Sequence, residues 1–242
     1  MPSKIEWLRG QDGKPGETWN PFGWGCYGPT GTAENPRPCS YCYAKRLADR
    51  KLRKCPQCQA FIPHWHPEEL EKPFHWRKPK RIFVASMSDP FGKWVQRKEL
   101  EWVLLSMLDA RHHTYYLLTK QPEQIATKLP NWEWANWPSF FPNLWIGVSV
   151  TCTADLPRIA MLRDAWPGHK FVSFEPLYSM DTVPDLADIE WVIIGAQTGP
   201  VRQPIGTAVV SVETAAALYR VPVFEKDNLE LTHLVKRQEW PR

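Results

Sequence analysis

Short apolar runs alternate with segments of helical periodicity between residues 81 and 224, and this alternation restricts the fold more than any other feature. The runs that we expect to be buried strands are 81–86, 114–118, 144–150, 171–174, 191–194 and 222–224. Apolar residues recur at helical spacing between them, at 98–110, 122–129, 154–165 and 209–219. Strands that alternate with helices in this way build parallel βαβ units. The chain is therefore predicted to be an α/β protein with a parallel sheet.

The number of these units favours a partial or complete parallel (β/α) barrel over an open sheet. A short strand at 18–24 would add a first unit, and Pro21 and the glycines limit its length. The 242 residues suffice for one large domain. We expect a single domain over residues 1–242, with an inserted loop rich in Cys and His at about 53–72. Residues 1–17 are interpreted as a polar lead-in, and 130–143 as a loop over one end of the barrel.

Charge and hydropathy say more about the expected location and partners of the protein than about its activity. The net charge of +4 suits an anionic cofactor or a nucleic acid, but many proteins with this charge bind neither. The Trp cluster at Trp132, Trp134 and Trp137 could stack on bases or pack a loop. No signal-peptide core and no run of membrane-spanning length is present, so we expect a soluble, cytoplasmic protein without a membrane partner. Close Cys pairs in that compartment are more often metal ligands than disulfides.

Three cysteines lie close together near the amino terminus: Cys26, Cys39 and Cys42. The Cys39-Ser40-Tyr41-Cys42 turn runs into a basic helix predicted at 44–53, which would direct two thiols to one place. A closed zinc site or a closed iron-sulfur cluster takes four protein ligands, whereas a 4Fe-4S cluster on three thiolates leaves one iron open to a small molecule. Three thiols therefore indicate an open cluster.

This part of the chain resembles a phage-associated family of radical S-adenosylmethionine-like proteins that is distantly similar to spore photoproduct lyase. The resemblance rests on TWNP at 18–21, on Gly25 and Cys26, and on CSYCYAKR at 39–46. The chain departs from the usual radical spacing, because twelve residues rather than three separate its first two cysteines. The resemblance implies a barrel of the radical S-adenosylmethionine type. Cys26, Cys39 and Cys42 would hold the catalytic 4Fe-4S cluster, and its open iron would chelate S-adenosylmethionine.

The resemblance also implies roles for polar residues that follow the predicted strands, where the functional groups of parallel barrels collect. The residues implied to bind S-adenosylmethionine are Tyr41, Ser86, Ser88, Asp89, Ser149, Glu175, Gly195 and Gln197. Those implied to bind substrate are Lys120, Lys226 and Asn228. Simpler interpretations stay open: a helix cap or turn at 86–89, buried hydrogen-bonded anchors at 149 and 175, a plain turn at 195–199 and a salt-bridged end at 226–228.

The inserted loop carries a second set of metal-ligand types, Cys55, Cys58, His64 and His66. Their pattern is C-x2-C-x5-H-x-H, which suits zinc, although a single residue between the histidines is tighter than usual. Reduced surface thiols beside a turn are the simpler alternative. A different zinc ribbon would use Cys39, Cys42, Cys55 and Cys58 and would leave Cys26 without a role.

Two functions follow from these motifs. The first is a radical S-adenosylmethionine enzyme of the isomerase, lyase or base-modifying class, which takes one electron from an external reductant and forms a 5′-deoxyadenosyl radical that removes a hydrogen atom from its substrate. The resemblance implies a nucleobase, nucleotide or DNA substrate, DNA hypermodification by a phage, and the cytoplasm of an infected or lysogenic host. The second is a zinc-dependent nucleic-acid-binding protein without catalysis, with helix 44–54 on phosphates.

Overall fold

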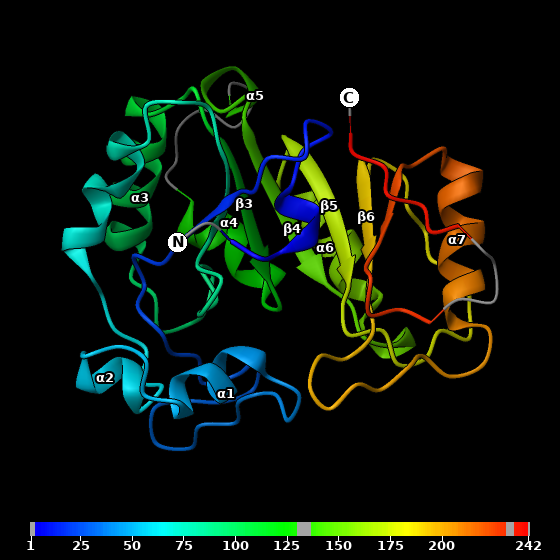
Figure 1. Cartoon of the computed structure of the whole chain (residues 1–242), viewed down its shortest axis with the longest axis horizontal. Coiled ribbons are helices and arrows are strands. Elements are labelled where there is room, and N and C mark those ends of the chain that lie inside the picture. The colour runs from blue at the N-terminus through cyan, green and yellow to red at the C-terminus, as the bar shows by residue number, and fades with distance from the viewer. Residues whose placement is uncertain (1–2, 130–136, 231–234, 242) are drawn as a thin grey trace.

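Seven parallel strands in sequential order form the centre of the computed structural model, which describes residues 3–129, 137–230 and 235–241 (Figure 1). The strands are β1 (Glu17–Trp19), β2 (Arg81–Val84), β3 (Thr114–Thr119), β4 (Leu144–Ser149), β5 (His169–Phe174), β6 (Trp191–Ile194) and β7 (Val223–Glu225). Among these residues β1 and β7 pair with one neighbour each and form the two edges, so the sheet is a partial barrel. The predicted α/β class with a parallel, partly closed barrel is confirmed.

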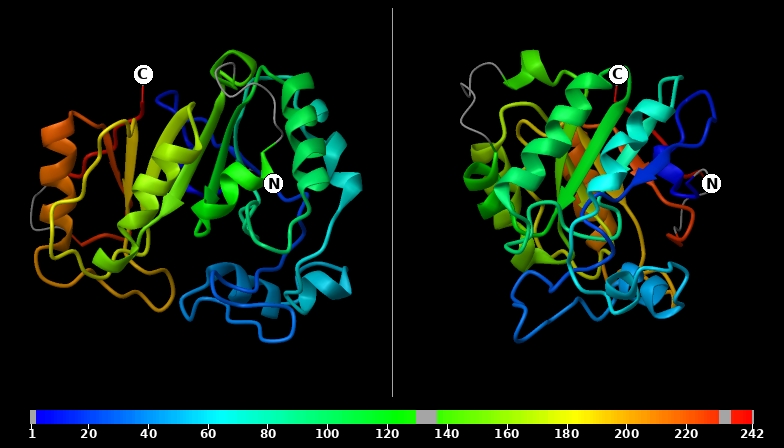
Figure 2. Two further views of the ribbon diagram at one scale, coloured as in Figure 1. Left: turned by 180° about the vertical axis from the view of Figure 1, so that it is seen from behind. Right: turned by 90° about the vertical axis from the view of Figure 1, so that its left-hand side faces the viewer.

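Helices cover the outer face of this sheet and one of its ends. The α-helices are α1 (Tyr43–Asp49), α2 (Pro56–Gln59), α3 (Arg97–Asp109), α4 (Ile125–Lys128), α5 (Trp137–Phe140), α6 (Pro157–Ala165) and α7 (Ala208–Tyr219). Short 3-10 segments are η1 (Glu6–Leu8), η2 (Pro67–His75), η3 (Pro122–Gln124) and η5 (Thr153–Asp155). Side chains of α3, α4, α6 and α7 pack on the outward residues of the strands, while α1 and α2 lie below the strand ends (Figures 1 and 2).

The inner face of the sheet is filled by aromatic rings in its amino-terminal half. Alternate strand residues point inward, and the buried cluster there comprises Phe83, Tyr116, Trp145, Phe171, Trp191, Ile193 and Phe224 together with Trp7 and Leu8. The Trp7 ring lies 5.1 Å from the Phe83 ring and 5.9 Å from the Trp191 ring, measured between centroids. The interpretation of residues 1–17 as a mere polar lead-in is therefore wrong, because η1 inserts two apolar side chains into the barrel.

Small and polar side chains replace the rings toward the carboxyl ends of the strands. Gly147 pairs with Phe171, and a methyl group on Gly147 would lie 2.5 Å from the Phe171 ring. Two residues further along each strand, Ser149 pairs with Ser173, and Glu175 directly follows β5. The aromatic layer therefore ends at this level, and polar groups begin.

The predicted elements agree with the observed ones except where turn chemistry intervenes. The strand expected at 18–24 ends at Trp19, and the helix expected at 44–53 ends at Asp49. The helices expected at 122–129 and 154–165 each begin as 3-10 turns. The inserted loop contains α2 and η2, which the sequence pattern did not indicate. The loop expected at 130–143 includes α5, and residues 130–136, with Trp132 and Trp134, lie outside the described residues.

Within the described ranges, the helices are all too short or too polar to cross a membrane.

Candidate functional site

The segment that carries the three cysteines lies beneath the carboxyl ends of the strands (Figure 1). Its first part is fastened to the end of β2 through Gly25. The Gly25 N–H donates to the Met87 carbonyl at 3.1 Å, and the Ser88 hydroxyl donates to the Gly25 carbonyl at 2.7 Å. Cys26 is therefore presented directly next to the 86–89 segment.

The second part of the segment is a turn that opens α1. The Cys42 N–H donates to the Cys39 carbonyl at 2.9 Å, and the Cys42 sulfur accepts the Lys45 N–H at 3.4 Å as the cap of α1. The Tyr43 hydroxyl donates to the Ser86 carbonyl, and the Arg46 guanidinium donates to the Thr198 carbonyl. These two contacts hold α1 against the ends of β2 and β6.

The three thiols share one electrostatic environment. Burial raises the pKa of the Cys26 thiol, and the charges of Asp89, Cys42 and Cys39 raise it further. Burial is also the main cause that raises the pKa of Cys42. The raised pKa values keep the thiols of Cys26 and Cys42 protonated at neutral pH, and a bound metal centre would favour their thiolate forms.

Cys26, Cys39 and Cys42 lie outside the compact group of ligand atoms that the described residues contain. Among the described residues, the group of Cys, His and acidic side chains whose ligand atoms all lie within 4.8 Å of one another is the one in the inserted loop, and it excludes Cys26, Cys39 and Cys42. A cubane cluster binds each thiolate through a different iron and therefore spaces its ligands more widely than one ion does. Charge interactions of Cys26 with Cys42 and Cys39 show that the three thiols are neighbours, and three thiolates are the ligands that a 4Fe-4S cluster with an open iron takes.

The 86–89 segment is held by the protein itself. The Asp89 carboxylate is buried and accepts from the Phe91 N–H at 3.0 Å, the Thr119 hydroxyl at 2.7 Å and the Lys120 N–H at 3.0 Å. Burial raises the pKa of Asp89, and these hydrogen bonds oppose the shift. The carboxylate thus joins the end of β2 to the end of β3.

The side chains of Ser86 and Ser88 are likewise hydrogen-bonded to other residues of the protein. The Ser86 hydroxyl donates to the Asn20 side-chain oxygen at 3.2 Å, which also accepts the Met87 N–H at 3.0 Å. Together with the Ser88 contact to Gly25, these bonds anchor the cysteine segment. The implied contact of Ser86, Ser88 and Asp89 with S-adenosylmethionine stays a prediction.

Glu175 and Lys226 form an ion pair across the ends of β5 and β7. Their side chains are 23% and 13% exposed, respectively. A methyl group on Gly195 would lie 2.9 Å from Lys226 Cδ and 3.3 Å from Glu175 Cγ, so glycine at that position lets the pair close over the end of β6. The structure thus joins three predicted site residues from three strands.

Asn228 secures the turn that follows β6. Its amide nitrogen donates to the Ala196 carbonyl at 2.7 Å, and its oxygen accepts the Ala196 N–H at 3.3 Å. Ser149 has no exposed surface, and its hydroxyl donates to the Glu175 carbonyl at 3.4 Å. Both residues support the strand ends, and their predicted ligand contacts stay predictions.

Tyr41 and Gln197 contact Tyr178, which the sequence interpretation did not select, and Lys120 lies beside Tyr41. The Tyr41 and Tyr178 rings lie 5.6 Å apart between centroids, and the Lys120 ammonium lies 5.7 Å from the centre of the Tyr41 ring. The Tyr178 hydroxyl donates to Gln197 Oε1, and the Arg202 guanidinium lies 4.9 Å from the centre of the Tyr178 ring. Aromatic and cationic groups therefore border the cysteine segment.

Several contacts come from motif residues to which no role was assigned. Asn20, Tyr43 and Arg46 all belong to the quoted motifs, and each ties the cysteine segment to the barrel. Tyr178 had no sequence signal of its own, because its position follows from the turn after β5.

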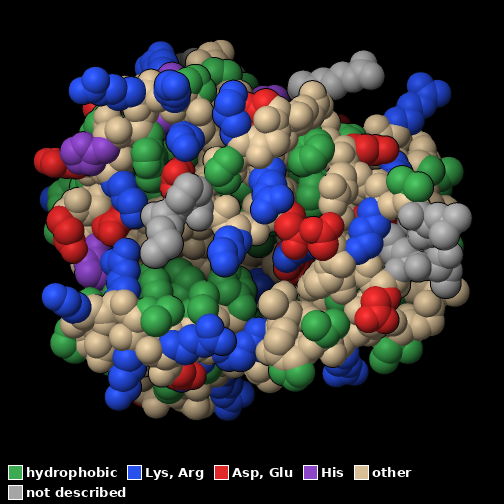
Figure 3. Space-filling view, in the orientation of Figure 1, with side chains coloured by type: hydrophobic (Ala, Val, Ile, Leu, Met, Phe, Trp, Pro, Cys, Tyr) green, Lys and Arg blue, Asp and Glu red, His purple; other side chains and the backbone are tan. Residues whose placement is uncertain are grey.

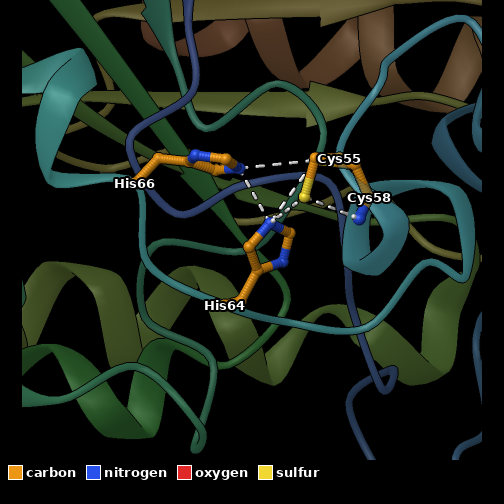
Figure 4. Close-up of side chains that lie close together, drawn as sticks. All are labelled: Cys55, Cys58, His64 and His66. Carbon is orange, nitrogen blue, oxygen red and sulfur yellow. Dashed lines mark hydrogen bonds between the residues drawn. The ribbon is translucent and has the colours of Figure 1, made fainter.

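The inserted loop brings Cys55, Cys58, His64 and His66 together (Figure 4). In the described part of the chain, the ligand group that holds Cys55 and Cys58 includes His64 and His66 and not Cys39 and Cys42, so the alternative ribbon of four cysteines is not formed.

Comparison with known proteins gives a family and a distant likeness. The structure is similar to spore photoproduct lyase: a cysteine-to-alanine mutant with dinucleoside spore photoproduct matches with TM-score 0.37 and 11% identity over 83% of this chain and 61% of that one. A second structure of this lyase mutant matches with TM-score 0.35 and 10% identity over 76% of this chain and 58% of that one. The chain thus spans less than two thirds of either lyase chain. No curated protein matches. Residues 2–237 match the family described as "Protein of unknown function (DUF5131)", so the chain belongs to this family.

Proposed function

We propose that the protein is a radical S-adenosylmethionine enzyme that modifies a nucleobase or nucleotide. The observation that carries this proposal is the set of three half-buried thiols, Cys26, Cys39 and Cys42, which sits at the carboxyl ends of a parallel partial barrel. In parallel barrels that end holds the reacting groups. Three thiolate ligands leave one iron of a 4Fe-4S cluster free for a small chelating molecule.

When bound, the cluster would supply one electron from an external reductant for cleavage of S-adenosylmethionine to methionine and a 5′-deoxyadenosyl radical. The chain's own residues would hold and orient the reactants. Ser88 and Asn20 fasten the cysteine segment under β2, and Arg46 fastens α1 under β6. Glu175 and Lys226 place one charge of each sign at the strand ends, where polar groups of S-adenosylmethionine or substrate would be received.

The nucleotide class is supported by the groups around Tyr178. Two Tyr rings with nearby Lys120 and Arg202 offer both a stacking surface for a base and cations for phosphate. Lys and Arg side chains also border a hydrophobic area above α1 on the face of the molecule shown in Figure 3. Isomerase, lyase and other base-modifying reactions, DNA hypermodification in a phage setting and action in the host cytoplasm remain parts of the proposal that rest on the sequence resemblance.

The alternative is a non-catalytic zinc protein that binds nucleic acid through residues 44–54. Within this segment Arg46 binds the Thr198 carbonyl and Arg53 pairs with Glu69. Arg50, Lys51 and Lys54 are exposed and could meet phosphates.

Electron paramagnetic resonance tests the proposal after anaerobic purification and reconstitution. We expect the dithionite-reduced protein to give a 4Fe-4S signal that shifts on addition of S-adenosylmethionine, with 5′-deoxyadenosine accumulating. Cys26→Ala, Cys39→Ala and Cys42→Ala should each abolish both results. Cys152→Ala is the matched control, since Cys152 is a half-buried thiol outside the set, and it should retain them. A protein that forms no cluster, or whose cluster is indifferent to S-adenosylmethionine, would refute the proposal.

A further inference from the structure

The ligand atoms of the four-residue group in the inserted loop all lie within 4.8 Å of one another, close enough to surround one metal ion. His64 Nε2 lies 3.3 Å from Cys55 Sγ and 3.4 Å from Cys58 Sγ, and His66 Nε2 lies 3.5 Å from Cys58 Sγ. Zinc bonds of about 2.3 Å to sulfur and about 2.0 Å to nitrogen, at tetrahedral angles, place sulfur and nitrogen ligands about 3.5 Å apart. The four side chains already point toward one centre (Figure 4).

The outer partners of both histidines prepare them as ligands. The Nδ1 atom of His64 is hydrogen-bonded to the Ile62 carbonyl at 2.6 Å, and the Nδ1 atom of His66 to the Glu68 carboxylate. Both partners are acceptors, so each Nδ1 carries the proton and each Nε2 presents its lone pair to the centre. Two histidines that merely filled a surface turn would not need this common tautomer.

The cysteines also have the surroundings of metal-bound thiolates. Cys55 caps the short helix α2, and its sulfur accepts the Cys58 N–H at 3.4 Å. Cys58 is completely buried, and the main-chain N–H of Trp24 lies near enough to act on its sulfur. Hydrogen bonds from N–H groups support the charge of a thiolate when a metal draws off its proton.

The group packs directly on the chain that leads to Cys26. The His66 N–H donates to the Pro21 carbonyl at 2.7 Å. A methyl group on Gly23 would lie 2.6 Å from the His64 ring, and one on Gly25 would lie 2.3 Å from the Ile62 main chain. The main-chain N–H of Trp24 lies beside the Cys58 sulfur. In the stretch 21–25, Pro21 and Trp24 therefore meet the loop through main-chain atoms. Gly23 and Gly25 have no room for a side chain against it.

We propose that Cys55, Cys58, His64 and His66 bind one Zn²⁺ in a closed structural site, and that this ion holds residues 21–25 so that Cys26 is presented at the strand ends. Four protein ligands complete the tetrahedron and leave no position for substrate. The metal site itself does not depend on the proposed radical chemistry. A site of this kind makes the binding free energy of the ion part of the folding free energy of the loop.

Metal analysis of cluster-free protein separates this proposal from the proposed function. The variant Cys26→Ala/Cys39→Ala/Cys42→Ala is expected to retain one zinc per chain, and Co²⁺ in its place should give the visible absorption of a tetrahedral sulfur-nitrogen site. Adding Cys58→Ser should remove the metal and the absorption, whereas adding Cys152→Ser should not. Absence of zinc from the triple variant, or its retention after Cys58→Ser, would overturn the site. Absence of iron from the wild-type protein would count against the radical function alone.

Glu68→Gln tests the site without removing a ligand. Because partners of metal-bound histidines usually contribute 10- to 100-fold to affinity, the zinc Kd from competition with a chromophoric chelator should rise by that factor. Glu71→Gln is the matched control, since Glu71 is an exposed acid in the same segment, η2, and it should leave the Kd unchanged. Equal Kd values for the two variants would overturn the inference that the Glu68 carboxylate prepares His66 as a ligand.

Hydrogen exchange tests the second half of the proposal. Chelation of zinc from the triple variant should speed amide exchange in peptides covering residues 21–28, while peptides from β4 and β5 stay protected. Unchanged exchange at 21–28 after complete zinc removal would refute the role in holding Cys26.

Discussion

The ion pair between Glu175 and Lys226 permits a quantitative test of how the strand ends are held. Lys226→Met keeps most of the aliphatic stem that packs against Gly195 and removes the ammonium group. Breaking a buried pair costs about 3–5 kcal/mol, and an exposed pair contributes about 0–1 kcal/mol. With 23% and 13% of the two side chains exposed, we expect the free energy of unfolding to fall by about 1–3 kcal/mol.

The pH dependence of this loss has a definite sign. Burial by itself lowers the pKa of Lys226, but attraction to Glu175 outweighs it, and the pKa lies above its ordinary value. The stabilisation is therefore present at neutral pH and is lost only as strongly alkaline pH passes the raised pKa. In Lys226→Met this alkaline loss should be absent, because the group that titrates has been removed.

Urea unfolding followed by Trp fluorescence measures both effects. Adding Glu175→Gln to Lys226→Met should restore part of the stability, with a coupling free energy of about 1–2 kcal/mol. Lys14→Met is the control, because the Lys14–Asp12 pair is 80% and 47% exposed and should contribute less than about 1 kcal/mol. If Lys226→Met costs no more than this control, or if the two substitutions are additive, the pair is solvated and the reasoning fails.

Two further predictions concern the stability of the fold, one at Gly147 in β4 and one at His113 before β3. Gly147→Ala should lower the unfolding free energy by about 1–3 kcal/mol, because its methyl group would overlap the Phe171 ring; thermal denaturation measures this loss, and Phe171→Leu should relieve part of it if the overlap is the cause. Burial lowers the pKa of His113, whose neutral ring accepts from the Lys80 N–H and bonds to the Pro73 carbonyl. The neutral His113 ring therefore contributes fully to stability above about pH 6.5, and this contribution is lost as the pH falls through the lowered pKa. In His113→Gln the Tm should fall less steeply between about pH 7 and about pH 5 than it does in the wild-type protein. An unchanged pH profile would contradict that assignment.

The fold class and the types of metal ligand could be predicted from the sequence because their signals are local. The apolar runs at 81–86 and 144–150 mark buried parallel strands wherever they lie in space, since both faces of such strands are covered. The C-x2-C turns at Cys39 and Cys55 place two thiols side by side through the geometry of one helical turn. A prediction from local patterns also missed the buried part of residues 1–17, because Trp7 and Leu8 are too few to form a periodic pattern.

The joining of distant segments was decided by the tertiary structure. The register of β5 and β7 brings Glu175 to Lys226, and the turn after β2 brings Ser88 to Gly25. Packing of the inserted loop against residues 21–25 holds His64 and His66 at the chain segment that leads to Cys26. A sequence states which groups are available within a few residues of one another, whereas the meeting of groups 50 or more residues apart depends on strand register and on which loops share one end of the barrel.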